Sequence, residues 1–312
     1  MPKISIILPT YNVEPYIERA LQSCINQTFK DIEIIVVDDC GHDKSIEIAK
    51  DYAKKDERIK IIHNEKNLGT FASRNMGVFN SNADYIMFLD PDDYLELNAC
   101  ETINSYLDKK NQLIIFNFFN HGQSNLNIDF VCEDIQNFLL RYCIVFYKYH
   151  FLNPVFNKVY TKELLLQSLI NIDAYARILM TEDLYLNFLY IQNIKDIYFL
   201  NENLYHYCEN LNSITNEKQY IKIKSIIQDI EFVNHKLLFM SNSISKEYFL
   251  ATRLSIYHSE IYKLDLTYKY LTKFFLKKLM LKIKRKMVKI KMKKYIKLAK
   301  DILKEENVSS SL

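Results

Sequence analysis

Three carboxylates occupy four consecutive positions, Asp90, Asp92 and Asp93, with a proline after the first. Residues 85–89 before them form a short apolar run, typical of a strand that is buried on both faces. Proline removes a backbone donor and keeps the preceding residue out of the helical region, so the strand must end here. Hard carboxylate oxygens suit Mg²⁺ or Mn²⁺. Taken alone, the acids predict either a metal site or an acidic turn before a helix that begins near Leu97.

The chain before these acids alternates between apolar strands and amphipathic helices. Strands are predicted at 3–8, 32–37, 59–62 and 85–89, and helices at 15–26, 46–54 and 70–79. Asp43 and Ser45 lie where N-caps of the second helix are expected. This order and spacing predict parallel strands joined by right-handed crossovers, and hence an α/β fold. Further along, a strand is expected at 113–119 and a covered helix at 138–149.

Polar residues follow three of the predicted strands. The first strand ends near Tyr11, the second at Asp38 and Asp39, and the fourth at Asp90. Because the carboxyl ends of parallel strands meet at one edge of a sheet, these side chains are expected to share one site. The chain has no GxGxxG or GxxxxGK[ST] pattern, which argues against a dinucleotide-binding fold and a P-loop. An aromatic face and carboxylates without these loops favour a nucleotide held by its base and, through a metal, by its phosphates.

The charge of the chain is unevenly distributed. Fourteen Lys and Arg residues lie between 269 and 300, where no Asp or Glu occurs, while residues 1–268 contain 26 bases and 35 acids. The six cysteines form no CxxC pair and no zinc-ligand spacing, which predicts reduced thiols in a cytosolic protein. Residues 1–12 lack the features of a signal peptide, and no later stretch approaches the ~20 uninterrupted apolar residues of a spanning helix.

Four segments in series resemble the motifs of family 2 of the nucleotide-sugar glycosyltransferases. The segments are ISIILPTYN (4–12), QTFKDIEIIVVDD (27–39), NLGTFASRNMG (67–77) and YIMFLDPDD (85–93). The resemblance implies the GT-A fold, which is Rossmann-like with a mostly parallel central sheet, here followed by a C-terminal helical extension. The chain is most similar to bacterial lipooligosaccharide β-1,3-galactosyltransferases within this family. The assignment of galactose as the transferred sugar rests on that resemblance alone, because UDP-GalNAc, UDP-GlcNAc and UDP-glucose would use the same uridine contacts.

The resemblance also implies a uracil pocket. Pro9, Thr10 and Tyr11 would line it, with Tyr11 against the base, and Asp39 would accept a hydrogen bond from the pyrimidine N–H. Each residue also has an ordinary structural interpretation. Tyr11 fits a half-buried aromatic at a rim, and Asp39 fits a helix cap. The ordered series of motifs favours the pocket over these interpretations.

Three further residues are assigned to the ribose, diphosphate and metal by the same resemblance. Arg74 would approach the base or diphosphate, Asp90 would hold the ribose, and Asp92 would ligate the Mn²⁺ or Mg²⁺ that bridges the phosphates. In isolation, Arg74 fits a surface ion pair worth at most ~1 kcal/mol. Asp38 and Asp93 receive no role, because a neighbouring carboxylate is often structural.

Glu182 and Asp183 form a second acidic landmark. Thr181 is expected to cap a helix that places both acids in its first turn, with an apolar stripe that includes Leu184 and Phe188. Acids commonly stabilise a helix start without any other role. The family resemblance implies that Asp183 is the general base of an inverting transfer and that Glu182 supports it.

Residues 204–214 resemble the segment that closes over the diphosphate in the family. Cys208 replaces a usual Arg, and Asn210 replaces a frequent His, which puts a phosphate clamp from this loop in doubt. His206 fits a further metal ligand, but a packed and hydrogen-bonded histidine is the more common interpretation. A catalytically inactive sugar-nucleotide or glycan-binding protein with the same fold is the alternative function. A nucleotidyltransferase would need a glycine-rich loop after the first strand, and residues 9–12 provide none.

The domain prediction follows from these motifs and from the basic tail. Residues 1–215 would form the catalytic domain, with a donor-binding half to about 110 and an acceptor half from about 111. Residues 216–312 would be helical, and about 269–304 would form a basic amphipathic tail with an apolar stripe. Such a helix suits the anionic cytoplasmic face of the inner membrane, where a lipid-linked oligosaccharide acceptor would lie. Binding of nucleic acid and simple packing on the body are the alternatives; nucleic acid is not expected.

Overall fold

The computed structural model describes residues 1–107, 112–120, 122–124, 132–145, 153–170, 172–174, 176–210, 219–240 and 245–309. Contacts within the chain divide it into two compact units. The sheet unit comprises residues 1–133, 154–178 and 193–210, and the helical unit comprises 134–153, 179–192 and 211–312. The domain boundary expected at residue 215 stays a prediction.

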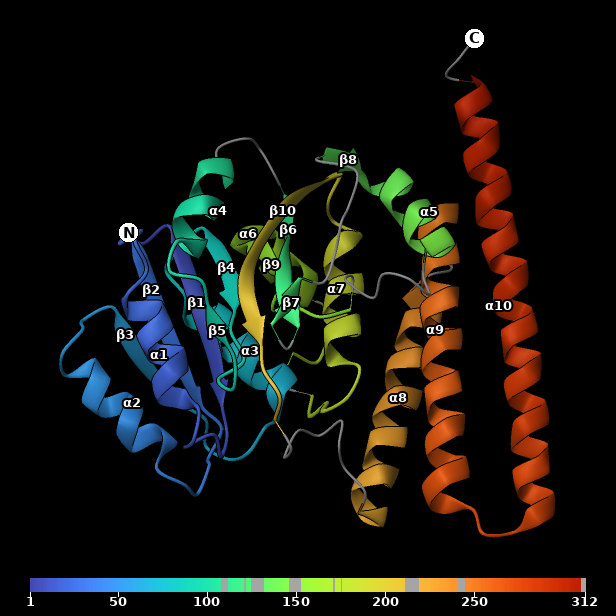
Figure 1. Cartoon of the computed structure of the whole chain (residues 1–312), viewed down its shortest axis with the longest axis horizontal. Coiled ribbons are helices and arrows are strands. Elements are labelled where there is room, and N and C mark those ends of the chain that lie inside the picture. Colours follow the sequence, from blue (N-terminus) through green and yellow to red (C-terminus); the bar gives the residue numbers. More distant parts are fainter. Residues whose placement is uncertain are drawn as a thin grey trace. The chain divides into compact units, whose positions relative to one another are not determined.

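The sheet unit is built on one mixed sheet (Figure 1). Its strands are β1 (Ile4–Thr10), β2 (Ile32–Asp38), β3 (Ile59–His63), β4 (Tyr85–Phe88), β5 (Tyr94–Leu95), β6 (Leu113–Asn120), β7 (Gln123–Ser124), β8 (Cys132–Asp134), β9 (Lys158–Thr161) and β10 (Asp196–Tyr207). Among the described residues the order is β3-β2-β1-β4-β9-β6-β10-β5, with β7 on β6 and β8 on β10. Strands β3, β2, β1 and β4 are parallel neighbours, which confirms the predicted edge. Strand β9, not predicted from the sequence, runs antiparallel between β4 and β6.

Helices pack on both faces of β1. The helices of this unit are α1 (Ile17–Ile25), α2 (Ser45–Ala53), α3 (Thr70–Asn80), α4 (Ala99–Leu107) and α6 (Lys162–Leu169). Ile6 belongs to a core cluster with Leu21 of α1 and Ile103 of α4. Ile7 faces α3, where a Cβ on Gly77 would lie only 2.3 Å from its Cγ2. Burial on both faces explains why Ile6, Ile7 and Leu8 of β1 are consecutive apolar residues rather than alternating with polar ones.

The first strands and helices begin and end within two residues of their predicted positions. The start of α2 differs in its capping. Lys44 occupies the N-cap position without a side-chain bond, and the Asp43 carboxylate instead accepts the N–H of Ser45 at 3.1 Å. The acidic turn after β4 is followed by β5, and the next helix, α4, begins at Ala99.

The helical unit contains α5 (Ile135–Val145), α7 (Glu182–Ile191), α8 (Tyr220–Met240), α9 (Lys246–Leu266) and α10 (Phe275–Ser309). A π-helical turn at Thr267–Leu271 follows α9. Buried side chains join these helices: the Tyr248 hydroxyl donates to the Phe188 carbonyl at 2.7 Å, and α8, α9 and α10 lie side by side (Figure 1). The helix predicted at 138–149 begins earlier, and residues 146–149 lie outside the described residues. In the described part of the chain, no helix has the length and apolar character needed to cross a membrane.

Candidate active site

The loop after β1 presents an exposed tyrosine. Thr10, the last residue of β1, is buried, and its backbone carbonyl accepts the N–H of Asp39 at 3.0 Å. Pro9 is half-buried in the same strand. Tyr11 is 44% exposed, so its ring can be reached from solvent. The parallel pairing of β1 with β2 therefore brings the ends of these two strands together, as the sequence predicted.

A second loop fixes the conformation of the first. Asn12 adopts a left-handed φ of 52°, and its side-chain oxygen accepts the N–H of His42 at 2.7 Å. Gly41 lies so close that a Cβ would be 3.0 Å from the Asn12 nitrogen. The Ser45 hydroxyl accepts the N–H of Val13 at 2.9 Å. Tyr11 therefore projects from a loop whose backbone is held by the segment after β2.

The Asp39 carboxylate is 3% exposed and accepts three hydrogen bonds. Its Oδ1 accepts from Asn64 Nδ2 at 2.8 Å and from the Leu68 N–H at 2.7 Å, and its Oδ2 accepts from the Gly69 N–H at 2.8 Å. Gly69 is the residue immediately before α3, so Asp39 anchors the loop that leads into that helix. The helix-cap interpretation therefore describes part of what Asp39 does. The Oδ2 atom has capacity to accept a second donor.

Arg74 and Asp90 form an ion pair between α3 and the end of β4. Arg74 Nη2 donates to Asp90 Oδ1 at 2.8 Å, and the guanidinium lies 5.9 Å from the centre of the Phe88 ring. The Arg74 side chain is 4% exposed, whereas that of Asp90 is 26% exposed. The surface interpretation of Arg74 is wrong, because its side chain is buried and its guanidinium lies close to the Phe88 ring of β4. A buried guanidinium with a fixed carboxylate partner retains its geometry better than a surface pair does.

Asp92 lies two residues after Asp90 and is held from two sides. Its Oδ2 accepts a hydrogen bond from Asn210 Nδ2 at 2.8 Å, and its backbone carbonyl accepts one from Arg19. Burial, and then the charge of Asp90, raise the pKa of Asp92 above its usual value. The environment therefore penalises the charged carboxylate unless a cation compensates.

Asp93 is a buried anchor to which the sequence alone assigns no role. It is 1% exposed; its Oδ2 accepts the Tyr205 hydroxyl at 2.6 Å and its Oδ1 accepts the Cys208 N–H at 2.7 Å. Burial, and then the charges of Asp90 and Asp92, raise the pKa of Asp93 to about 8. Two features of the sequence could have indicated this anchor: Asp93 is the third acid in the run that ends a buried strand, and a distant segment contains Tyr205 and Tyr207.

The donor set at this turn fits one divalent cation held partly by oxygens of a ligand. Within the described ranges, no group of three or more His, Cys, Asp or Glu residues is arranged to hold a metal by itself. Asp92 offers hard carboxylate oxygens, which suit Mg²⁺ or Mn²⁺, and phosphate oxygens commonly complete such sites. The raised pKa values of Asp92 and Asp93 have the same origin, crowded and partly desolvated negative charge that a cation would relieve.

His206 is packed rather than placed as a metal ligand. Its ring stacks on Tyr94, with centroids 4.1 Å apart, and on Phe119, with centroids 4.7 Å apart. Its Nε2 forms a 2.6 Å hydrogen bond with Glu96 Oε1. The structural interpretation of His206 is therefore correct. Residues 211–214 of the predicted closing segment lie outside the described residues.

Asp183 belongs to the helical unit and lies in the first turn of α7, as predicted. Thr181 occupies the N-cap position but has a left-handed φ of 65°, and its side chain makes no capping bond. Its hydroxyl donates instead to the Met180 carbonyl, so the predicted side-chain cap is wrong. The Asp229 carboxylate of α8 accepts the Leu179 N–H at 2.9 Å and anchors the chain before α7. Residues 184–191 of α7 are all buried, which leaves the half-buried acids at the accessible end of the helix.

Comparison with known proteins identifies the family. The profile described as glycosyl transferase family 2 matches residues 5–166. The Bacillus subtilis (strain 168) protein named uncharacterized glycosyltransferase EpsJ is 35% identical over 225 residues, which are 69% of this chain and 63% of that protein. The chain thus spans slightly less than two thirds of that relative. These matches show that the chain belongs to glycosyltransferase family 2.

Another relative is named for a specific transfer reaction. The GalNAc(5)-diNAcBac-PP-undecaprenol beta-1,3-glucosyltransferase of Campylobacter jejuni subsp. jejuni serotype O:2 is 32% identical over 137 residues, covering 44% of each chain. That activity is the relative's own.

Two solved structures confirm the GT-A fold. Staphylococcus aureus TarS 1-349 in complex with UDP-GlcNAc has a TM-score of 0.65 at 19% identity, covering 86% of this chain and 73% of that one. The mannosyltransferase PcManGT from Pyrobaculum calidifontis, in complex with GDP-Man and Mn²⁺, has a TM-score of 0.56 at 12% identity, covering 96% and 86%. At these identities the likeness concerns the fold, and the ligands belong to those proteins.

Proposed function

We propose that the protein is an inverting, metal-dependent glycosyltransferase that transfers a hexose from a UDP-sugar to a lipooligosaccharide or another cell-surface glycan. The observation that supports this most strongly is the pairing of Arg74 with Asp90 and of Asn210 with Asp92 in a partly buried turn at the end of β4. Parallel register places the ends of β1 and β2 along the same edge of the sheet. Membership of family 2 supports the reaction type.

The uridine would bind at the loops after β1 and β2. Pro9, Thr10 and Tyr11 would line the uracil pocket, where the exposed Tyr11 ring offers a stacking surface. Stacking of a base on an aromatic side chain is typically worth ~1–3 kcal/mol. Asp39 would accept the pyrimidine N–H on Oδ2, the oxygen that accepts one hydrogen bond from the protein. The three donors that already hold this carboxylate would fix its direction before the nucleotide arrives.

The ribose and diphosphate would bind at the turn after β4. Asp90 would hold the ribose, Arg74 would approach the base or the diphosphate, and Asp92 would hold Mn²⁺ or Mg²⁺. When bound, the divalent cation neutralises charge that develops on the departing nucleoside diphosphate. The structure of PcManGT contains Mn²⁺, which supports a metal for this fold. The Arg74–Asp90 pair would keep the ribose ligand in a single orientation.

Asp183 would act as the general base. It would remove the proton from the attacking acceptor hydroxyl, which typically contributes ~10²- to 10⁴-fold. Attack from the side opposite the leaving group inverts the anomeric carbon, so an α-linked donor gives a β-linked product. Glu182 would be a supporting neighbour of Asp183 in the same helix turn. No second nucleophilic carboxylate is required for this route.

The acceptor would be a lipid-linked oligosaccharide, reached from the cytoplasmic face of the inner membrane. The Campylobacter jejuni relative is named for an undecaprenol-linked substrate and a β-1,3 linkage, which supports this acceptor class. UDP-galactose is the proposed donor, and the product would carry galactose in β-1,3 linkage. UDP-GalNAc, UDP-GlcNAc and UDP-glucose are the alternative donors. In domain terms, residues 1–215 would carry catalysis, and about 269–304 would form the membrane-associating tail.

A screen of UDP-sugars tests this function. Release of UDP is measured for UDP-galactose, UDP-glucose, UDP-GlcNAc and UDP-GalNAc, with Mn²⁺, with Mg²⁺ and with a chelator. We expect UDP release from one donor, stimulated by metal and abolished by chelation. Binding of UDP-sugars without turnover in the presence of glycan acceptors would instead support the alternative, an inactive sugar-nucleotide-binding protein.

A further inference from the structure

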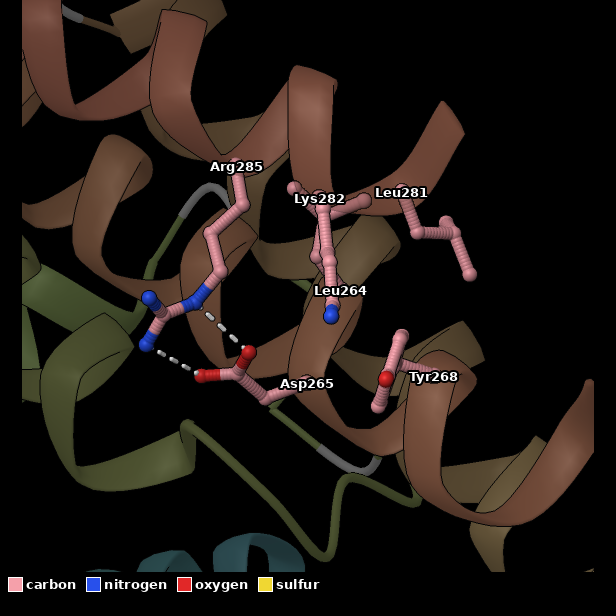
Figure 2. A pocket seen from close by; sticks show the side chains of 6 residues that line it. All are labelled: Leu264, Asp265, Tyr268, Leu281, Lys282 and Arg285. Carbon is pink, nitrogen blue, oxygen red and sulfur yellow. Dashed lines mark hydrogen bonds and ion pairs between the residues drawn. The ribbon is translucent and has the colours of Figure 1, made fainter. Parts of the chain in front are cut away.

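Helix α10 has an inner face that packs within the helical unit. Met292 and Ala299 are completely buried, and the Tyr295 ring meets that of Tyr257 of α9 at 5.6 Å. Arg285 forms an ion pair with the Asp265 carboxylate: Nη2 donates to Oδ2 at 2.9 Å, and Nε lies 2.7 Å from Oδ1 (Figure 2). The helix is therefore a fixed part of the unit. For this face of α10, the alternative that the tail simply packs on the rest of the protein is correct.

The opposite side of α10 carries a second apolar surface, here called the outer stripe. It consists of Leu276, Met280, Ile283, Met287 and Ile290, which are between 54% and 73% exposed. They are spaced alternately by four and three residues, so at about 100° per residue they lie along one side of the helix. A contiguous exposed apolar stripe on a folded helix marks an interaction surface.

Lysines border the outer stripe on both sides. Lys277, Lys284 and Lys291 recur every seven residues along one border, and Lys286 and Lys293 lie along the other. All five are exposed. No acid occurs between residues 269 and 300, so nothing in this part of the helix neutralises these charges. The surface that α10 presents is apolar along its centre and positive along its borders.

A small cavity on the inner side is a weaker candidate for a ligand site. It has a volume of about 180 Å³ and is lined by Leu264, Asp265, Tyr268, Leu281, Lys282 and Arg285 (Figure 2). Asp265 already neutralises Arg285 there, and the Lys282 ammonium lies 5.5 Å from the centre of the Tyr268 ring. The charges of this cavity are therefore engaged within the protein. Among the described residues, the five lysines beside the outer stripe form no such ion pair or ring contact.

We propose that the outer stripe docks the helical unit on an anionic lipid bilayer, with α10 lying in the plane of the membrane surface. Leu276, Ile283 and Ile290 would enter the boundary between headgroups and acyl chains, and the bordering lysines would contact lipid phosphates. The inference rests on the proposed function only in its purpose, which is to bring the protein to a lipid-linked acceptor. Docking itself requires only the surface of α10.

The bilayer fits this surface better than two other occupants. Alternating spacings of four and three also suit helix pairing, but a second copy of α10 would bring two rows of lysines together without an acid between them. Nucleic acid would satisfy the lysines and leave the apolar stripe in water. An anionic bilayer complements both the charge and the apolar area.

Vesicle sedimentation with the full-length chain tests the proposal. Phosphatidylcholine vesicles are compared with vesicles that also contain phosphatidylglycerol, for the unmodified protein and for the Ile283→Glu variant. Leu97→Glu is the matched control, because Leu97 and Ile283 are both 54% exposed and Leu97 lies in the sheet unit. We expect binding to anionic vesicles that weakens about tenfold or more in Ile283→Glu and is unchanged in Leu97→Glu. Replacing Lys284 and Lys291 by Gln should weaken binding on the order of tenfold.

Several results would overturn the docking proposal. These are equal binding to neutral and anionic vesicles, unweakened binding of Ile283→Glu, or a dimer that light scattering shows to dissociate in that variant. Retention of a nucleic acid duplex that is lost in Ile283→Glu would also overturn it. UDP release measured on the same preparations separates this proposal from the proposed function. Vesicle binding without any UDP release contradicts the proposed transfer reaction and leaves the docking standing. UDP release without vesicle binding contradicts the docking and the membrane-associating tail and leaves the transfer reaction standing.

Discussion

The hydroxyl of Tyr205 donates a 2.6 Å hydrogen bond to Oδ2 of Asp93, and both side chains are buried. The same hydroxyl accepts the N–H of Asp90 at 3.3 Å. The Phe156 ring stacks on the Tyr205 ring, with centroids 4.5 Å apart. The end of β10 thereby holds the acidic turn at both its first and its last carboxylate residue. The turn owes its conformation to a residue more than one hundred positions away in the sequence.

Replacing Tyr205 by Phe should destabilise the protein. The ring and its stacking remain, but Asp93 loses a buried donor, which typically costs ~1–3 kcal/mol. Chemical denaturation measures the free energy of unfolding. Tyr16→Phe is the control, because Tyr16 is half-buried and its hydroxyl makes no hydrogen bond within the described residues. A Tyr205→Phe protein as stable as the control would show that the hydroxyl does not hold the turn.

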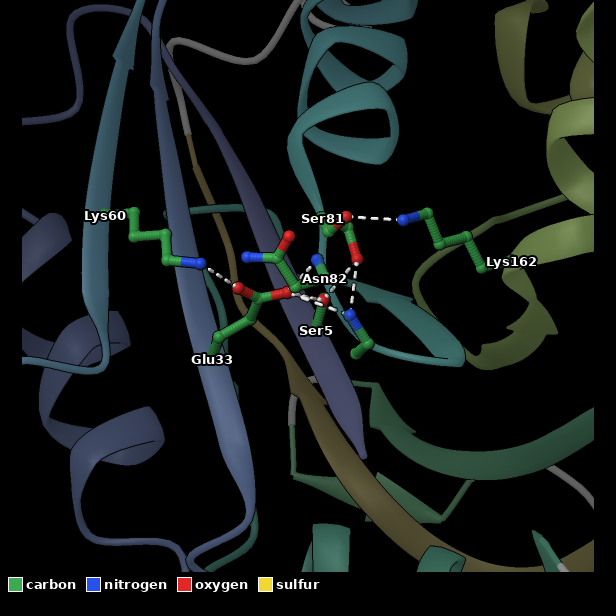
Figure 3. Close-up of polar contacts among 7 residues, drawn as sticks. Ser5, Glu33, Lys60, Ser81, Asn82 and Lys162 are labelled. Atoms are coloured by element: carbon green, nitrogen blue, oxygen red, sulfur yellow. Dashed lines mark hydrogen bonds and ion pairs between the residues drawn. The ribbon is translucent and has the colours of Figure 1, made fainter. Parts of the chain in front are cut away.

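Glu33 predicts a pH dependence of stability. Burial opposes ionisation of this carboxylate, but hydrogen bonds from Lys60, Ser5 and the Asn82 N–H outweigh burial and hold its pKa below the usual value (Figure 3). Because the folded pKa is depressed, Glu33 contributes stability above its unfolded pKa of about 4.3, and this contribution is lost as the pH falls toward the folded pKa.

The Glu33→Gln variant tests this linkage. Near neutral pH it should unfold with a free energy lower by about 1–3 kcal/mol, and the gap to the unmodified protein should narrow on acidification below about pH 4.3. Urea denaturation across this pH range measures both effects. Glu47→Gln, at an exposed position of α2, is the control and should change neither. A gap that stays constant with pH would contradict the depressed pKa.

Gly77 is required by the approach of α3 to β1. A Cβ at this position would lie 2.3 Å from Cγ2 of Ile7, so Gly77→Ala should destabilise the protein by about 1–3 kcal/mol through overpacking. The Ile7→Ala variant removes the obstructing atoms at a cost of its own. The double variant should lose less stability than the sum of the losses in the two single variants. Thermal unfolding measures all three losses. Strict additivity would show that Gly77 and Ile7 do not compete for this space.

Arg74→Lys should weaken UDP binding although charge is conserved. Lysine has one ammonium in place of a planar guanidinium, so it cannot keep the Asp90 contact and also face a ligand in the same way. We expect UDP affinity to fall about tenfold, corresponding to ~1.4 kcal/mol. Titration calorimetry of UDP with Mn²⁺ measures this. Arg141→Lys, at an exposed position of α5, should bind UDP normally; equal affinity for the two variants would exclude a role for Arg74.

The parallel half of the fold could be predicted because its signals are local. Strands β1, β2 and β4 are mostly apolar and buried on both faces, with Ser5 and Glu33 as buried polar exceptions in β1 and β2. Each is followed by polar residues at the same edge of the sheet. Strand β9 gave no such signal. It has four residues, and antiparallel pairing between β4 and β6 depends on neighbours distant in the sequence.

The supporting contacts of the candidate site could not be predicted for the same reason. Asp93 and Tyr205 are 112 residues apart, and Asp92 and Asn210 are 118 residues apart. Thr181 has the residue type of a helix cap, but its left-handed backbone and its bond to the preceding carbonyl depend on the local path of the chain. Residue type and spacing identify acids that can do chemistry; the partners that orient them come from folding.

The most direct test of the proposed mechanism compares Asp92→Asn and Asp183→Asn for two properties of the same preparations. Titration calorimetry measures Mn²⁺-dependent binding of UDP, and UDP release measures turnover with donor and acceptor. The proposal predicts that Asp92→Asn loses the metal-dependent part of UDP binding. It predicts that Asp183→Asn binds UDP normally and turns over about 10²- to 10⁴-fold more slowly. Normal turnover by Asp183→Asn, or undiminished Mn²⁺-dependent binding by Asp92→Asn, would contradict it.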